Sequence, residues 1–124
     1  MKEFKNNHSV AMLSAQLVLV TYRRQKVLTP TAVDIFKKAA AMVSINHFVE
    51  IEKVNGEPDH LHVLISFNVT TQLDKFINSL KSCSSRLLKK EIPTFRWSAG
   101  YWIGSFGAAD EDVIKNYVDN QAGV

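Results

Sequence analysis

Hydrophobic and polar residues follow patterns that predict four β-strands. Residues 10–22 (VAMLSAQLVLVTY) are apolar on both faces, which is typical of a long central strand. Residues 47–54 and 60–67 predict two further strands, and the NGEP segment at 55–58 predicts a tight turn that joins them in a hairpin. Residues 101–106 (YWIGSF) predict a fourth strand, rich in aromatic side chains.

Apolar residues at helical spacing predict three helices. The first begins at Pro30, which suits the first turn of a helix, with Thr31 and Asp34 as a capping box. The second begins near Thr70 or Thr71 and has one apolar stripe and an opposite basic side. A short final helix covers residues 113–121 and follows acidic residues that favour a helix N-terminus.

The predicted order is β-α-β-β-α-β followed by a helix. This order indicates an α+β fold, the ferredoxin-like sandwich, in which two helices cover one face of an antiparallel sheet. The other face then needs a cover, which the final helix or a second subunit can provide. With 124 residues we expect a single domain that spans 1–124.

Composition narrows the class of protein. The chain is 46% hydrophobic and 22% charged, as in an ordinary globular protein. No apolar run approaches the ~20 residues of a membrane span and no signal-peptide pattern opens the chain, so we expect a cytoplasmic protein without a membrane partner. The single cysteine, Cys83, cannot form an internal disulfide, and it lies on the apolar stripe of the second helix. We interpret Cys83 as a core residue and not as a nucleophile.

Positive charge is concentrated in two segments, although the net charge is only +3. Six basic residues and one acidic residue lie between Lys75 and Arg96, and a second basic cluster follows the first strand. Either cluster alone is most simply a solvated surface. Together, beside a pair of histidines, they favour a polyanionic partner. The candidate contacts to it are Arg23, Arg24, Lys26, Lys81, Arg86, Lys89 and Lys90.

His60 and His62 lie on one face of the predicted strand 60–67. Strand side chains alternate, so Leu61 between them points to the other face. One buried histidine is ordinary, but two side by side need a shared partner, most simply a metal ion or a phosphate. A purely structural pair is the alternative interpretation.

Tyr117 and Gln121 are four residues apart on the predicted final helix and therefore share one of its faces. A tyrosine with its usual pKa of ~10 is a poor nucleophile at neutral pH. It becomes effective where a divalent cation polarises the target phosphate and positive charge favours the phenolate. Two imidazoles and a glutamine oxygen make three ligands that tolerate Mg²⁺, Mn²⁺ or Ni²⁺. A core aromatic is the alternative for Tyr117, which lies on an apolar stripe.

Five stretches carry a resemblance to a known family. They are LVLVTYRRQKVL, PDHLHVLISF, LKSCSSRLLKK, RWSAGYWIGSFG and VIKNYVDNQ. In this order they resemble the small single-tyrosine transposases of the His-hydrophobe-His (HUH) superfamily, the TnpA-type enzymes of minimal bacterial and archaeal insertion sequences. The resemblance covers nearly the whole chain, and its most specific part is PDHLHVLISF followed about 50 residues later by YVDNQ.

The resemblance implies a metal-binding pair of His60 and His62, the nucleophile Tyr117, and Gln121 as third ligand of Mg²⁺ or Mn²⁺. It implies cleavage of single-stranded DNA with a 5′-phosphotyrosine link and a free 3′-hydroxyl, followed by rejoining without an external energy source. It also implies a homodimer that recognises DNA hairpins, in which the tyrosine helix of one subunit completes the histidine pair of the other.

Two alternatives remain open from the sequence. A domesticated relative that processes repeated genomic palindromes would have the same site, and genome context would separate the two. A non-catalytic nucleic-acid-binding module is a different class, since ferredoxin-like sheets often present aromatic rings to bases. Such a module would not need the histidine pair and the tyrosine helix together, so we favour catalysis. The aromatics available for stacking are Phe95, Trp97, Tyr101 and Trp102.

Overall fold

Four strands form one antiparallel sheet in the order β4-β5-β3-β6 in the computed structural model, which describes residues 4–5, 10–11, 13–105 and 111–121. Two very short strands pair separately near the N-terminus. The strands of the sheet are β3 (Leu13–Val20), β4 (Val49–Glu57), β5 (His60–Phe67) and β6 (Trp102–Ser105), and those of the separate pair are β1 (Phe4–Lys5) and β2 (Val10–Ala11).

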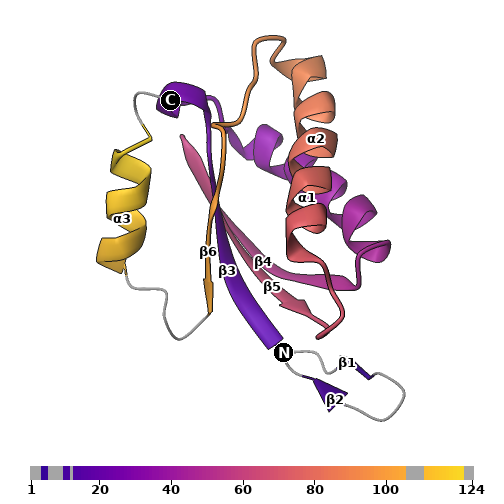
Figure 1. Ribbon diagram of the computed structural model, residues 1–124. Coiled ribbons are helices and arrows are strands. Elements are labelled where there is room, and N and C mark those ends of the chain that lie inside the picture. The colour runs from indigo at the N-terminus through magenta and orange to yellow at the C-terminus, as the bar shows by residue number, and fades with distance from the viewer. Residues whose placement is uncertain (1–3, 6–9, 12, 106–110, 122–124) are drawn as a thin grey trace.

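Helices cover both faces of the sheet, as Figure 1 shows. Two of them, α1 (Pro30–Ile45) and α2 (Leu73–Glu91), lie together on one face, and α3 (Glu111–Asp119) lies on the other. The predicted ferredoxin-like α+β fold is confirmed. Within this chain, the cover of the second face is its own final helix.

The central strand β3 contributes to a separate core on each face. Leu17 and Leu19 belong to the large core under α1 and α2, whereas Val18 and Val20 pack against Ile114 and Val118 of α3. Full burial of one such side chain is worth ~1.5–3 kcal/mol. This double burial explains why residues 17–20 are apolar at every position.

The turn between β4 and β5 lies later than predicted. Asn55, Gly56 and Glu57 continue β4 and pair with residues of β5, so the prediction of an NGEP turn is wrong, and Pro58 and Asp59 form the turn instead. A Cβ at Gly56 would lie 2.7 Å from a methyl group of Val33 on α1. Glycine therefore allows a close approach of helix and sheet here.

The cap of α1 also differs from the prediction. Thr29 precedes the helix, and its Oγ1 accepts a hydrogen bond from the backbone N–H of Ala32 over 3.1 Å. The predicted capping box of Thr31 and Asp34 is wrong, since both residues lie inside the helix. The prediction of Pro30 in the first turn is confirmed.

A strained turn ends the central strand before the predicted limit of residue 22. A 3₁₀ turn, η1 (Tyr22–Arg24), follows, and Arg23 and Arg24 both have a φ of 54°, in the left-handed region. This conformation costs roughly 1–2 kcal/mol per non-glycine residue. Buried Thr21 stabilises the turn, because its Oγ1 lies 2.8 Å from the carbonyl oxygen of Gln25 and 3.0 Å from that of Asp59.

The aromatic loop before β6 serves the core. Phe95 and Trp97 are buried edge to face with ring centroids 4.9 Å apart, so neither ring is available for stacking on bases.

Cys83 is buried as predicted. Phe106 and Asp110, which the sequence assigned to the last strand and the start of the last helix, lie outside the described residues. In the described part of the chain, no helix has the length and apolar character to cross a membrane.

Candidate active site

The two histidines lie side by side on the sheet face that α3 covers. His60 and His62 pair with Val20 and Val18 of β3, whose side chains contact α3 on that face. The two imidazole rings have centroids 5.0 Å apart. The prediction that both histidines share one face of β5 is confirmed.

Asp59, the residue before the pair, fixes the orientation of His60. Its Oδ1 lies 2.8 Å from His60 Nδ1, and its Oδ2 accepts a hydrogen bond from Arg24 Nε over 2.9 Å. Burial alone would raise the pKa of the Asp59 carboxyl, but the hydrogen bonds from His60 and Arg24 outweigh burial and lower it. The ionised carboxylate holds a proton on Nδ1 of His60, which leaves Nε2 available for a ligand.

His62 is held by a residue of the central strand. Its Nδ1 lies 3.0 Å from Nε2 of Gln16 on β3. Gln16 pairs with Leu64, the next residue of β5 on the same face as His62. Burial lowers the pKa of His62, as does the nearby His60, while Glu57 acts in the opposite sense. The imidazole of His62 is therefore neutral at physiological pH, the form that binds metal ions.

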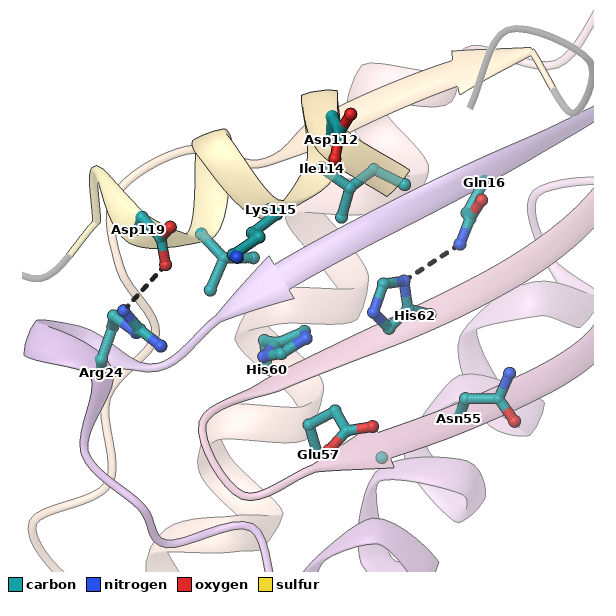
Figure 2. A pocket seen from close by; sticks show the side chains of 12 residues that line it. Gln16, Arg24, Asn55, Glu57, His60, His62, Asp112, Ile114, Lys115 and Asp119 are labelled. Atoms are coloured by element: carbon teal, nitrogen blue, oxygen red, sulfur yellow. Dashed lines mark hydrogen bonds and ion pairs between the residues drawn. The ribbon is translucent and has the colours of Figure 1, made fainter. Parts of the chain in front are cut away.

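The histidines open into a pocket of about 1000 Å³ between the sheet and α3. Figure 2 shows the labelled side chains that line it, with the imidazoles on the sheet side and polar groups of α3 opposite them. The pocket is lined from the sheet by Gln16, Asn55, Gly56, Glu57, His60 and His62, from η1 by Arg24, and from α3 by Asp112, Ile114, Lys115, Val118 and Asp119.

The donor set fits part of a metal site. Imidazoles suit a divalent transition-type cation, but a stable site needs further ligands. Nε2 of His60 is free for an ion, whereas Nε2 of His62 carries the proton as long as the Gln16 amide donates to Nδ1. Among the residues that the structure describes, no group of three or more His, Cys, Asp and Glu side chains is placed to hold an ion. The pair therefore needs a donor of another kind, or from another place, to complete a site.

Tyr117 and Gln121 do not line the histidine pocket of their own chain. Oε1 of Gln121 accepts a hydrogen bond from Ser98 Oγ over 2.9 Å. The hydroxyl of Tyr117 lies 3.9 Å from the position that a Cβ at Gly100 would occupy, and burial raises the pKa of that hydroxyl. The single chain thus brings the histidines together and holds the tyrosine and the glutamine elsewhere.

The packing of α3 explains this separation. Ile114 and Val118 point at the sheet and define the buried stripe of the helix. Lys115 and Asp119 lie on one flank of that stripe and face the pocket (Figure 2). Helical spacing puts Tyr117 on the other flank. Rotation of the helix about its axis would expose its buried stripe, so the two flanks are not interchangeable.

The predicted cationic contacts fall into two groups. Arg24 is engaged with Asp59 and, over 3.3 Å, with Asp119 of α3, and Lys81 donates hydrogen bonds of 2.9 Å to the backbone carbonyls of Ser98 and Gly100. These two side chains hold structural elements together. The exposed members are Arg23, Lys26, Arg86, Lys89 and Lys90.

The exposed cations of α2 lie on the opposite side of the sheet from the histidines (Figure 1). Of the basic residues that follow β3, Arg24 lines the pocket. The structure therefore brings Arg24 to the histidine pair and leaves the α2 cluster on the other face of the sheet.

Sequence reasoning missed Asp59 and Gln16 as partners of the histidines. Gln16 is the one amide within an apolar central strand, which was a usable signal. Asp59 directly precedes the pair, but its contact with Arg24 joins residues 35 positions apart and has no local signature.

Comparison with known proteins decides the family. The sequence matches the family of IS200-like transposases over residues 9–121. The chain belongs to this family. It is 22% identical over 125 residues to the ISDra2 transposase TnpA of Deinococcus radiodurans, an alignment that covers 94% of this chain and 89% of that relative. The protein is thus a member of a family of enzymes that act on DNA.

Solved structures support the fold of this IS200-like transposase. A crystal structure of a Deinococcus radiodurans R1 transposase matches with a TM-score of 0.87 and 21% identity, over 98% of this chain and 99% of that one. A REP-associated tyrosine transposase bound to a REP hairpin matches with a TM-score of 0.60 and 16% identity, over 96% and 69%. A de novo designed ferredoxin-fold protein matches with a TM-score of 0.54 and 12% identity, over 81% and 93%.

Proposed function

We propose that this IS200-like transposase cleaves and rejoins single-stranded DNA through a covalent 5′-phosphotyrosine intermediate. The observation that carries the proposal is the histidine pair, with His60 oriented by Asp59 and His62 kept neutral by burial. A helix with a tyrosine lies over the same face of the sheet. Membership of a transposase family supplies DNA as the substrate class.

Tyr117 is the proposed nucleophile. Its oxygen attacks the scissile phosphorus, a Tyr–O–P bond forms, and the bond from phosphorus to the 3′-oxygen breaks to leave a free 3′-hydroxyl. In the second half-reaction, a 3′-hydroxyl of another strand attacks the phosphotyrosine and releases the tyrosine. One phosphodiester bond is exchanged for another, so the reaction needs no external energy source.

His60, His62 and Gln121 would hold a divalent cation, Mg²⁺ or Mn²⁺. When bound, such a cation supplies positive charge beside the scissile phosphate and favours the departure of the 3′-oxygen. His60 suits this role because Asp59 accepts from its Nδ1–H and leaves Nε2 unprotonated. His62 can bind the ion through Nε2 once the Gln16 amide presents its oxygen, in place of its nitrogen, to Nδ1. The amide of Gln121 supplies an oxygen donor.

Two chains are proposed to build each site. In a single chain, neither Tyr117 on α3 nor Gln121 after it lines the histidine pocket. No third His, Cys, Asp or Glu side chain of the described residues is placed to complete a metal site with the histidines. A homodimer in which α3 of each protomer docks on its partner would supply both residues in trans. The helix has only 9 residues and depends on tertiary packing, so an exchange of docking surface preserves its stability.

Single-stranded DNA with hairpin ends is the proposed partner. The relative bound to a REP hairpin shares the fold, and this chain exposes basic side chains on η1 and α2. Burial of Phe95 and Trp97 weakens the alternative of a module that only stacks on bases.

A labelling experiment tests the proposed chemistry. The protein is incubated with Mg²⁺ and single-stranded DNA that carries the sequences flanking its own gene, and the products are separated on a denaturing gel. A 5′-phosphotyrosine link retains the 3′ fragment, so a 3′ label is expected to migrate with the protein and a 5′ label to appear in a shorter free strand. A 5′ label on the protein, or no adduct with either label, would refute the mechanism.

A further inference from the structure

Tyr22 carries two guanidinium groups close to its ring. Cζ of Arg96 lies 4.3 Å and Cζ of Arg23 lies 5.2 Å from the ring centroid. Both arginines are exposed, and the tyrosine is half-buried. These three side chains, the Tyr22 stack, come from two segments: Tyr22 and Arg23 are adjacent in the chain, and Arg96 lies far from them in the sequence.

The backbone fixes the Tyr22 stack in place. The N–H of Tyr22 donates a hydrogen bond of 2.8 Å to the carbonyl of Arg96, and Thr21 forms an isolated antiparallel β-bridge with Trp97. Thr21 and Trp97 are both buried, so the two segments are anchored in the protein interior. The stack therefore sits on a rigid extension of the sheet.

The left-handed turn directs the side chains of Arg23 and Arg24 to different places. Arg24 turns into the histidine pocket toward Asp59, while Arg23 turns back over Tyr22. Arg23 of the Tyr22 stack is thus the chain neighbour of Arg24, which lines the pocket that we assign to the chemistry. A residue in a sparsely populated backbone conformation is often found at a functional site, since the strain fixes its direction.

Stacking orients a guanidinium and leaves its in-plane N–H donors free. An arginine held against an aromatic ring loses less side-chain freedom when it binds a phosphate than a free arginine does. Two guanidinium groups near one ring also repel each other, and a bound anion reduces this repulsion. We propose that the Tyr22 stack is a binding subsite for the phosphodiester backbone of single-stranded DNA beside the histidine pocket, and this rests on the proposed function.

Substitution of the uncharged Tyr22 ring distinguishes this proposal from simple electrostatic attraction between DNA and a basic surface. Tyr22→Leu removes no charge, so an unstructured basic surface would bind DNA equally well without the ring. Tyr22→Phe keeps the ring and removes only the hydroxyl. The expected order of affinity is wild type equal to Tyr22→Phe, followed by Tyr22→Leu.

Fluorescence anisotropy with a labelled single-stranded oligonucleotide in excess chelator measures binding in the absence of cleavage. Arg23→Gln/Arg96→Gln should weaken binding and reduce the salt slope by ~1.4, for two lost phosphate contacts at ~0.7 each. Lys37→Gln/Lys38→Gln removes two exposed charges from α1 and is the matched control, expected to bind as the wild type does. Tyr22→Leu should weaken binding several-fold, roughly 3- to 10-fold, as expected for a lost cation–π contact.

A double-mutant cycle excludes a merely structural effect. If the ring acts through the guanidiniums, Tyr22→Leu has no further effect in the Arg23→Gln/Arg96→Gln background. An equal loss in both backgrounds, or wild-type affinity of Tyr22→Leu, would overturn the proposal, as would equal losses for the arginine pair and the lysine pair. If the cycle gives the predicted result but the wild-type protein forms no tyrosine adduct with DNA, the proposed chemistry is refuted and the subsite stands.

Discussion

Asp59 and His60 are joined by a contact of 2.8 Å between Oδ1 and Nδ1, and this contact determines which nitrogen of the imidazole is available in the pocket. The same carboxylate accepts from Arg24, so a buried acid links the turn after β3 to the proposed metal ligand. A side chain that orients a metal-binding imidazole in this way fixes its tautomer and its ring orientation.

Asp59→Ala should weaken Mn²⁺ binding ~10- to 100-fold, because His60 loses its orienting acceptor. Asp59→Asn should fall between this variant and the wild type, since its amide oxygen still accepts from Nδ1 but has no charge. Isothermal titration of the DNA-free protein gives the affinities, and circular dichroism confirms that each variant is folded. Asp34→Ala on α1 is the control. Wild-type Mn²⁺ affinity in Asp59→Ala would show that Asp59 does not orient the ligand.

Lys81 and its neighbours on α2 should behave differently. Lys81 is half-buried and holds the carbonyls of Ser98 and Gly100, and burial lowers the pKa of its ammonium. Lys81→Met should reduce the free energy of unfolding by ~1–3 kcal/mol, as expected when buried hydrogen-bonding groups lose their partner. Arg86→Gln should change it by less than ~0.5 kcal/mol, as for other exposed positions. Urea denaturation measures both, and equal losses would contradict the assignment.

The exposed cations of α2 give a separate prediction about DNA. A triple substitution to glutamine at Arg86, Lys89 and Lys90 should leave stability unchanged and reduce the salt slope of single-stranded DNA binding by ~0.7 for each phosphate contact that is lost. An unchanged slope would mean that this face is only solvated, in agreement with its position across the sheet from the histidines.

Tyr117 should titrate at higher pH than an ordinary tyrosine while α3 is docked as described. Burial disfavours the phenolate and raises the pKa, so the protonated form is the one that folding stabilises. The contribution to stability is therefore complete below pH ~10 and is lost as pH rises through the raised pKa. The difference in phenolate absorbance between wild type and Tyr117→Phe isolates this group among the three tyrosines. A midpoint at or below ~10 would place the hydroxyl in water.

Local periodicity was sufficient for much of the fold. The alternation in HLHVLISF placed both histidines on one face, and the apolar pattern of β3 predicted burial on both of its sides. The NGEP turn was predicted wrongly because Asn-Gly usually marks a hairpin turn, whereas Gly56 makes room for Val33, a contact that only tertiary structure reveals.

Helical spacing predicted that Tyr117 and Gln121 share a side of the final helix, but α3 ends at Asp119 and Gln121 lies in the turn after it. The spacing also could not tell which flank of the helix faces the histidines. That depends on how Ile114 and Val118 dock on β3, a long-range packing relation. The Arg24–Asp59 contact is of the same kind, so a residue that looked like a free cation in the sequence is a structural partner of the site.

The central claim is that the catalytic centre combines histidines of one chain with the tyrosine of another. It is tested by mixing two inactive proteins, Tyr117→Phe and His60→Ala/His62→Ala, under conditions that exchange subunits. Each carries a different affinity tag, so that heterodimers can be counted by native mass spectrometry. Formation of the covalent adduct on 3′-labelled single-stranded DNA is the measurement.

In a heterodimer, one trans site has intact histidines from the first protein and an intact tyrosine from the second. The account predicts that an equal mixture recovers about one quarter of wild-type adduct, because half of the dimers are mixed and one of their two sites is complete. A site built within one chain would recover nothing, since each chain keeps its own defect. No adduct in a sample with confirmed heterodimers would contradict the central claim.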